Sequence, residues 1–342
     1  MLSTSQWGGE GVAGGRVTLQ RVADAAGVSL KTASRVVNGE RYVAAATAER
    51  VRSAVRELGF RPDQSARNLA RGRQVRMAGL LITTLANPRV VALAYGVEQV
   101  LRREGYSLII ASADEDPEAE QELLEEFQDR GVGSLVLVPS GDDHAHLVGA
   151  AERMNMVLAH RVVEGLDADS VAPDDVGATR RAVAELLETG HRRIGFIGDH
   201  RFIYNIEQRY AGYLAAYHDA GLEADEGLVS FGHRTAEESA EQMERLLSME
   251  EPPTAVFTSN NLNCLGALRV LRDRGAADAR IAVVGFDELP EAEYMGVPVT
   301  LLSYDQSDLG RSAANLLVQR DAGEATSPRH VTQPVTARRI AG

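Results

Sequence analysis

The sequence has a single cysteine, Cys264. One thiol can form neither an intrachain disulfide nor a thiolate zinc cluster, and such sparse use of cysteine favours a reducing compartment. No apolar run approaches the ~20 residues that a membrane span needs, and residues 1–15 lack the basic start and apolar stretch of a secretion signal. We therefore expect a cytoplasmic protein with no membrane partner. Residues 1–15, which include five glycines and show no hydrophobic periodicity, are expected to form a disordered tail.

The sequence also lacks the usual signatures of catalytic sites. It has no glycine-rich phosphate-binding loop and no nucleophile elbow of the Gly-x-Ser-x-Gly type. No pair of histidines has the spacing of metal ligands. We therefore expect that the chain is not an enzyme and that it needs neither a cofactor nor a metal.

The net charge of −13 is unevenly distributed along the chain. Residues 16–76 contain 13 Lys or Arg and 5 Asp or Glu, a net charge of +8, so the remaining residues carry −21. A basic segment is attracted to phosphate groups, whereas an acidic body is repelled by them. This division predicts a nucleic-acid-binding head on a body that does not itself bind DNA.

The basic head has the pattern of three short helices. Thr18 is a suitable N-cap for a helix over 19–26, and Gly27 is a suitable residue to end it. Ser29 can cap a second helix over 30–38, and a third helix is expected over 47–58. Two helices separated by a tight glycine turn form a helix-turn-helix, so we expect a DNA-binding domain over residues 16–61.

In such a domain the second helix lies in the major groove of DNA. Lys31 and Arg35 can donate to guanine, with Leu30 and Thr32 beside them on the first turn. The side chains of Thr18, Ser29, Ser34 and Asn38 suit phosphate oxygens, which set register rather than sequence preference. The predicted DNA-binding residues of the head are therefore Thr18, Ser29, Leu30, Lys31, Thr32, Ser34, Arg35 and Asn38.

From residue 77 onward, short apolar runs alternate with amphipathic stretches of helical length. This alternation predicts parallel sheets with helices on both faces, and about ten strands are too many for one compact sheet, so two lobes are expected. Open parallel sheets bind ligands at the carboxyl ends of their strands. The predicted strands are 78–82, 107–111, 134–138, 156–159, 194–197, 255–258 and 281–286.

Residues 17–39, VTLQRVADAAGVSLKTASRVVNG, resemble the helix-turn-helix of the lactose repressor and galactose repressor (LacI/GalR) family. Residues 63–73 are similar to the hinge helix of that family, within a hinge and linker segment over 62–74. The resemblance implies that Leu69 wedges into the minor groove and that the small Ala66 lets two hinge helices pack closely. So short a helix is expected to order only on a partner and DNA.

The rest of the chain resembles the sensor of the same family, a two-lobed α/β domain like a type I periplasmic sugar-binding protein, with two doubly wound parallel sheets. Segments that carry the resemblance include 85–88, 190–196 and 283–287. The resemblance places the sensor at 75–342. Its first lobe spans about 75–171 and 302–331, and its second about 172–301 and 332–342.

The resemblance also implies an effector site between the lobes, where a forked arginine and a carboxylate can hold the vicinal hydroxyls of a sugar. In two places this chain departs from the family: Asn260-Asn261 replaces the usual Asn-Asp, and His160 replaces Asp. Both changes remove negative charge, which raises the hypothesis of a sugar acid or sugar phosphate as effector. The implied effector-binding residues are Asn87, His160, Arg161, Arg209, Asn260 and Asp287.

These observations predict a DNA-binding transcriptional regulator, a repressor, whose operator affinity is controlled by a sugar-like effector. We expect a homodimer on a near-palindromic operator, because symmetric half-sites match a symmetric protein. Induction and corepression remain equally open. Two alternatives remain. One is the same DNA role with a protein corepressor, and the other is a sugar-uptake protein, which would have no use for a basic head.

Overall fold

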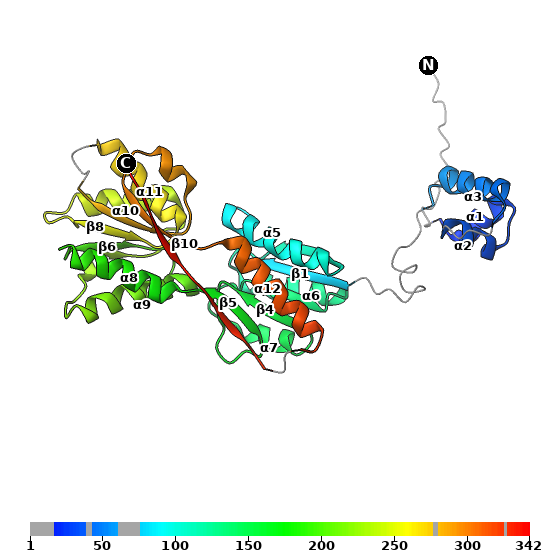
Figure 1. Ribbon diagram of the computed structural model, residues 1–342, viewed down its shortest axis with the longest axis horizontal. Coiled ribbons are helices and arrows are strands. Elements are labelled where there is room, and N and C mark those ends of the chain that lie inside the picture. Colours follow the sequence, from blue (N-terminus) through cyan, green and yellow to red (C-terminus); the bar gives the residue numbers. More distant parts are fainter. Residues whose placement is uncertain (1–16, 39–42, 61–75, 276–279, 325–326) are drawn as a thin grey trace, which may run out of the picture. The chain divides into compact units, whose positions relative to one another are not determined.

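The computed structural model describes residues 17–38, 43–60, 76–275, 280–324 and 327–342 (Figure 1). The chain divides into two compact units, residues 1–75 and Arg76–Gly342. We call them the head and the sensor and describe each by itself.

The head contains α1 (Leu19–Ala26), α2 (Leu30–Val37) and α3 (Ala45–Leu58). Thr18 Oγ1 accepts from the Arg21 amide to cap α1, and Ser29 Oγ accepts from the Thr32 amide to cap α2. Gly27 ends α1 at φ 61°, a left-handed conformation that glycine adopts without steric cost. The predicted caps and the glycine turn are confirmed.

The third helix of the head begins at Ala45, two residues before the predicted start. Its N-cap, Ala44, makes no side-chain cap hydrogen bond, so no polar residue marks this start in the sequence. The core of the head is built from small side chains, which let the three helices approach closely. Its buried members are Val22, Ala23, Ala26, Ala33, Val51 and Ala54.

The sensor consists of two lobes, each built on a six-stranded sheet. All pairings within the first sheet are parallel, and in the second only β12 is antiparallel to its neighbour β10. The first sheet has the order β11 (His330–Gln333), β5 (Asp169–Pro173), β4 (Asn155–Ala159), β3 (Ser134–Leu137), β1 (Arg76–Ile82), β2 (Tyr106–Ser112). The second has the order β12 (Thr336–Ile340), β10 (Val299–Ser303), β9 (Ala282–Phe286), β8 (Ala255–Thr258), β6 (Ile194–Ile197), β7 (Val229–Ser230).

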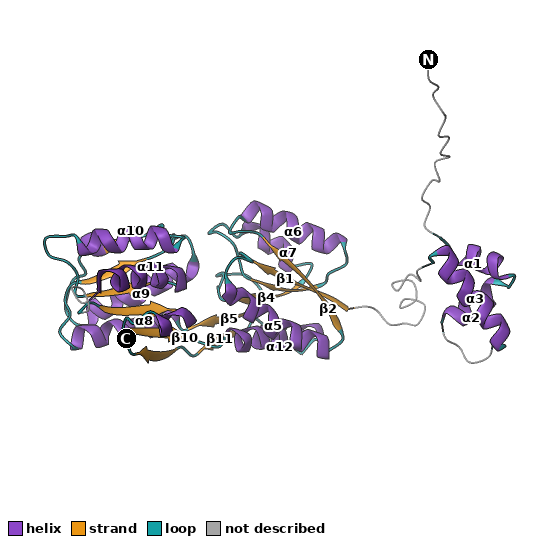
Figure 2. Ribbon diagram, turned by 90° about the horizontal axis from the view of Figure 1, so that it is seen from above, coloured by secondary structure: helices purple, strands orange, loops and turns teal. Residues whose placement is uncertain are grey.

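Helices cover both faces of each sheet (Figure 2). In the first lobe, α5 (Pro88–Arg103) and α12 (Gln306–Asp321) pack together on one face, and α6 (Pro117–Asp129) and α7 (Ala145–Ala151) on the other. In the second lobe, the pairs are α8 (Asp175–Glu188) with α9 (Tyr204–Asp219), and α10 (Ala236–Leu247) with α11 (Asn261–Arg274). The predicted doubly wound architecture is confirmed.

Successive strand residues point to opposite faces, which accounts for the near-continuous apolar runs in the sequence. Phe196 and Phe257 pack in the core beneath α8 and α9, whereas their neighbours Ile197 and Val256 pack beneath α10 and α11. A strand covered by helices on both sides therefore needs apolar side chains at every position.

The chain crosses between the lobes three times: after Pro173, after Ser303 and after Gln333. Each strand end lies two residues beyond the expected lobe boundary, which the sequence placed after residues 171, 301 and 331. These strands run on into the crossing without a glycine to mark their ends. The predicted strands also omitted β5, β7 and β10, as well as β11 and β12, whose exposed side chains give no apolar run.

Glycines allow the paired helices of the sensor to approach closely. A Cβ on Gly96 of α5 would overlap the backbone carbonyl of Ser307 on α12, and one on Gly310 of α12 would overlap that of Leu93. Gly212 of α9 meets the backbone of α8 in the same way. This packing fixes α5, α9 and α12, the helices that carry or adjoin the residues of the cleft described below.

Candidate functional site

The exposed face of α2 is basic. Lys31 and Arg35 are exposed and Leu30 is 46% exposed, while Ala33 on the opposite face is fully buried. Lys31 is also the only lysine in the chain. This helix therefore presents its charged side chains to solvent on a rigid support, as a DNA-reading helix does.

The polar residues of α2 also have local roles. Ser29 Oγ caps the helix and lies 2.9 Å from Thr32 Oγ1, and Asn38 Nδ2 donates to Ser34 Oγ at 3.3 Å. Thr18 Oγ1 is the cap of α1. Their predicted contacts with phosphate stay predictions. Ala66 and Leu69, the predicted hinge residues, lie outside the described residues.

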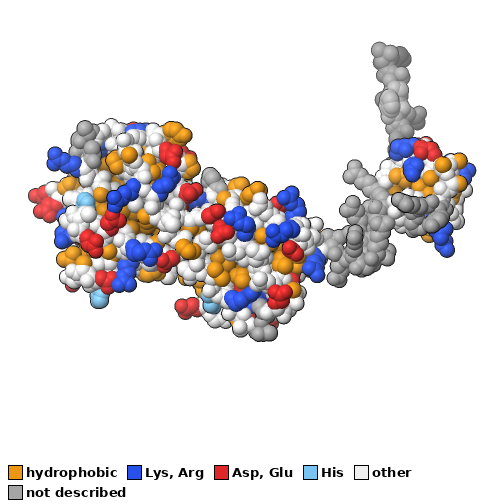
Figure 3. Space-filling view, in the orientation of Figure 1, with side chains coloured by type: hydrophobic (Ala, Val, Ile, Leu, Met, Phe, Trp, Pro, Cys, Tyr) orange, Lys and Arg blue, Asp and Glu red, His pale blue; other side chains and the backbone are white. Residues whose placement is uncertain are grey.

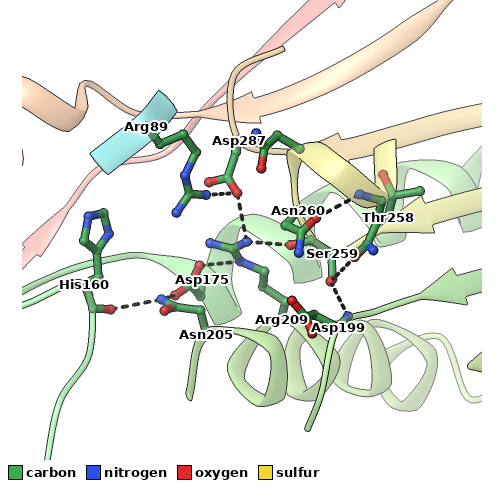
Figure 4. A network of polar contacts seen from close by, with 12 residues as sticks. Arg89, His160, Asp175, Asp199, Asn205, Arg209, Thr258, Ser259, Asn260 and Asp287 are labelled. Atoms are coloured by element: carbon green, nitrogen blue, oxygen red, sulfur yellow. Dashed lines mark hydrogen bonds and ion pairs between the residues drawn. The ribbon is translucent and has the colours of Figure 1, made fainter. Parts of the chain in front are cut away.

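In the sensor, a buried network of polar side chains joins the carboxyl ends of the two sheets (Figure 4). At its centre lies Arg209 of α9, which is 2% exposed. Its Nε donates to Asp175 Oδ1 at 2.8 Å, and its Nη1 donates to the Ser259 carbonyl at 2.5 Å and to Asp287 Oδ2 at 3.3 Å. The guanidinium carbon lies 3.6 Å from the centroid of the Phe286 ring. Arg209 is thus held in one orientation from several sides.

Asp287 follows β9 and is 1% exposed. Its φ is 77°, a left-handed conformation that is costly for a residue other than glycine and that the fold must enforce. Its amide donates to the Leu302 carbonyl at 2.7 Å, which fixes this turn against β10. Oδ2 of Asp287 also forms an ion pair with Arg89, which comes from α5 of the first lobe. Asp287 therefore links the two lobes.

His160 follows β4 and is also left-handed, at φ 67°. Its Nδ1 lies 3.0 Å from the hydroxyl of Tyr304, and its carbonyl accepts from Asn205 Nδ2 at 2.9 Å. The same Asn205 Nδ2 donates to Asp175 Oδ2 at 2.7 Å. Burial, together with the charges of Arg89, Arg161 and Arg209, holds the pKa of His160 well below its usual 6.5. His160 is therefore neutral at physiological pH.

Besides Asn205, three asparagines divide between helix capping and contact with the other lobe. Asn87 Oδ1 accepts from the Arg89 amide at the start of α5, and its Nδ2 donates to Asn261 Oδ1 at 3.4 Å. Asn260 caps α11 by accepting from the Asn263 amide at 2.9 Å. Asn261, rather than Asn260, thus meets the first lobe.

Arg161 is turned away from this network. Its Nη1 and Nη2 donate to the two carboxylate oxygens of Glu115 at 2.8 and 2.5 Å, and Nη1 also donates to the Pro139 carbonyl. Of the residues predicted to bind an effector, the structure brings Asn87, His160, Arg209 and Asp287 together, with Asn260 at the edge as a helix cap and Arg161 engaged elsewhere.

Four members of the network lie outside the predicted set: Arg89, Asp175, Asn205 and Tyr304. Asp175 and Tyr304 directly follow the crossings after β5 and β10, so the rule that ligands bind at the carboxyl ends of strands could have found them. Arg89 and Asn205 lie in the first turns of α5 and α9, and they join the network through contacts with the opposite lobe.

The network has two arginines, two aspartates and a neutral histidine. Burial raises the pKa of Asp175, and the adjacent Arg209 opposes that shift. With both carboxylates ionised the formal charges cancel, and the amides and hydroxyls provide donors and acceptors at close range. Such a set suits a neutral ligand with many hydroxyl groups. Among the described residues, no group of His, Cys, Asp and Glu is placed to hold a metal ion.

Comparison with known proteins identifies the architecture. Residues 18–63 match the family described as bacterial regulatory proteins, lacI family, and residues 75–338 match the periplasmic binding proteins and sugar binding domain of LacI family. The chain belongs to the LacI family of bacterial regulators. It is therefore a DNA-binding transcriptional regulator, as the resemblance predicted, and not a sugar-uptake protein. This is a family of regulators rather than of enzymes.

Several relatives of the LacI family match nearly the whole chain. The regulator PtxS of Pseudomonas aeruginosa is 33% identical over 323 residues, 94% of each chain, and CelR of Thermobifida fusca is 34% identical over 92% of this chain and 94% of its own. A solved complex of CelR with cellobiose has a TM-score of 0.70 at 31% identity, covering 96% of this chain and all of that one.

A pH dependence of stability follows from the neutral His160. Because its pKa is lower in the folded than in the unfolded protein, the unfolded state binds more protons between the two values, and the free energy of unfolding decreases as the pH falls below about 6.5. In His160→Asn, a residue that tolerates the left-handed backbone, this decrease should be shallower by up to about 1.4 kcal/mol per pH unit, the limit for one proton. Urea denaturation at a series of pH values measures both slopes. Equal slopes would mean that His160 is not held neutral.

Proposed function

We propose that this regulator is a repressor that binds a near-palindromic operator as a homodimer, and that a small, neutral, sugar-like effector bound between the lobes of the sensor controls its affinity for DNA. The observation that carries the effector class is the charge-balanced network around Arg209 and Asp287. In this proposal the protein acts in the cytoplasm, and it catalyses no reaction.

The arrangement of donors favours a sugar. A fixed guanidinium and a carboxylate can hold two neighbouring hydroxyl groups, one as acceptor and one as donor. The CelR relative was solved with cellobiose, a neutral sugar. A sugar acid is less favoured, since Arg161 is neutralised by Glu115 and the charge of Arg209 by Asp175 and Asp287.

The surface of the sensor supports a division of labour with the head. Figure 3 shows Arg side chains interspersed with Asp and Glu over the visible face of the sensor. Mixed charges of this kind give no extended basic surface for phosphate groups on that face. DNA recognition is accordingly assigned to α2, where Lys31 and Arg35 are exposed.

The homodimer is supported by an apolar surface around α5. Leu85, Val91 and Tyr95 are 62%, 60% and 56% exposed, and the last two lie one helical turn apart. A cluster of large exposed apolar side chains marks an interaction surface, and a two-fold dimer would bury the same patch from each copy.

Sedimentation of the full chain tests the dimer. We expect a dimer for the wild type and a monomer for Tyr95→Asp, because a carboxylate in an apolar interface loses its hydration. Val148→Asp is the matched control, since Val148 is 56% exposed on α7, outside this surface. A monomeric wild type would contradict the homodimer, and a dimer that survives in Tyr95→Asp would place its interface elsewhere.

The role of α2 can be measured with a duplex selected by the protein from a random pool and a scrambled duplex of the same length. Lys31→Ala is expected to weaken binding to the selected duplex by about 1–3 kcal/mol, the cost of one base contact, a factor of about 5 to 150. The scrambled duplex should lose little. The control Arg52→Ala removes an exposed charge from α3 that is already paired with Glu49, and it should affect both duplexes alike. Fluorescence anisotropy measures both affinities. If Lys31→Ala lost equal affinity for the two duplexes, Lys31 would not contribute to sequence recognition.

A further inference from the structure

Among the residues that the structure describes, three polar side-chain contacts cross the cleft between the lobes. Asn87 Nδ2 donates to Asn261 Oδ1, and Asn205 Nδ2 donates to the His160 carbonyl. The third is the ion pair between Arg89 and Asp287 Oδ2. It is the strongest of the three, because both partners are charged and the side chain of Asp287 is fully buried. Of the polar contacts across the cleft, the ion pair of Arg89 therefore contributes most to holding the lobes together.

The same end of the cleft leaves polar atoms unsatisfied. Asp287 Oδ2 serves both Arg89 and Arg209, whereas the buried Oδ1 has no hydrogen-bond partner among the described residues. The buried Arg89 Nε and Gln306 Oε1 also lack a partner there. Gln306 and Arg89 both lie close to the Tyr304 hydroxyl, so these atoms belong to one locality. An unpartnered buried polar group costs about 1–3 kcal/mol.

Hydroxyl groups of a ligand could hydrogen-bond all three of these atoms. A hydroxyl can accept from Arg89 Nε and donate to Asp287 Oδ1, and a second can donate to Gln306 Oε1. A carboxylate or an ionised phosphate can only accept, and it would repel Asp287 at short range. The unsatisfied atoms thus select a neutral ligand with neighbouring hydroxyl groups, in agreement with the charge balance of the network.

We propose that the ion pair of Arg89 with Asp287 Oδ2 is a latch that holds the lobes of the effector-free protein together, and that an effector engages the same two residues by placing a hydroxyl group between Arg89 Nε and Asp287 Oδ1. The role of an effector rests on the proposed function of the cleft. The latch itself does not, because it is a property of the chain without ligand.

The effect of this ion pair can be measured as the distance between two spin labels, one in each lobe. Glu122 on α6 and Glu241 on α10 are both exposed, and Figure 2 shows these two helices on the side of the sensor opposite the crossing strands β10 and β11. Opening about the crossings therefore lengthens the distance between them. Spin labels at Glu122→Cys and Glu241→Cys report this distance by double electron–electron resonance. Cys264 is fully buried and burial raises the pKa of its thiol to about 12, so it escapes labelling.

In the full chain without ligand, Arg89→Met is expected to lengthen the mean distance and broaden its distribution. Arg89→Lys keeps a positive charge and should stay close to the wild type. Arg102→Met is the matched control, because Arg102 lies on the same helix in a surface pair with Glu98. Arg89→Gln also removes the charge but keeps a polar side chain, and it serves if the methionine variant folds poorly. Wild-type distances in both neutral variants would overturn the latch, even if a sugar effector is later found, and longer distances would support it even if none is.

Discussion

The buried guanidinium of Arg209 is the contact on which the cleft depends. Placing a charge in the interior costs several kcal/mol unless partners surround it, and removing one partner of such a pair costs about 3–5 kcal/mol. Asp175, Asp287 and the Ser259 carbonyl supply those partners, and each comes from a different element of the second lobe. The requirement to satisfy Arg209 therefore fixes the ends of α8, β8 and β9 relative to α9. The left-handed backbone of Asp287 is part of this arrangement.

From this fixed centre, contacts extend to the first lobe through Arg89 and through the carbonyl of His160. A ligand that enters here changes which lobe arrangement is most stable only if it binds one arrangement better than another. A coupling of about 1–3 kcal/mol is enough to change DNA affinity by one to two orders of magnitude. Because Asp287 receives both Arg209 and the cross-lobe Arg89, it links the buried centre of the second lobe to the first lobe.

The parts of the structure that local chemistry determines could be predicted from the sequence. Thr18, Gly27 and Ser29 mark the ends of α1 and α2 by capping rules that act within a few residues. The parts that depend on distant packing could not. Arg89 reaches Asp287 only because two lobes close, and β12 pairs with β10 through an exposed sequence without an apolar pattern.

Arg161 illustrates why a neighbour of a site residue need not share its role. His160 has a left-handed backbone, which turns the chain so that the two consecutive side chains diverge. The ring of His160 meets Tyr304, whereas the guanidinium of Arg161 meets Glu115. The positive charge of Arg161 is therefore neutralised by Glu115, which supports the proposed preference of the cleft for neutral hydroxyl groups over acids.

The central claim is that a neutral polyhydroxylated ligand acts on DNA affinity through Asp287. The most direct test measures binding of the wild type and of Asp287→Asn to a selected operator duplex in the presence of a panel of neutral mono- and disaccharides and their acids. The account predicts that a neutral sugar changes the operator Kd of the wild type by about 5- to 150-fold and leaves that of Asp287→Asn unchanged. A response to acids alone, or an equal response in the two proteins, would contradict it.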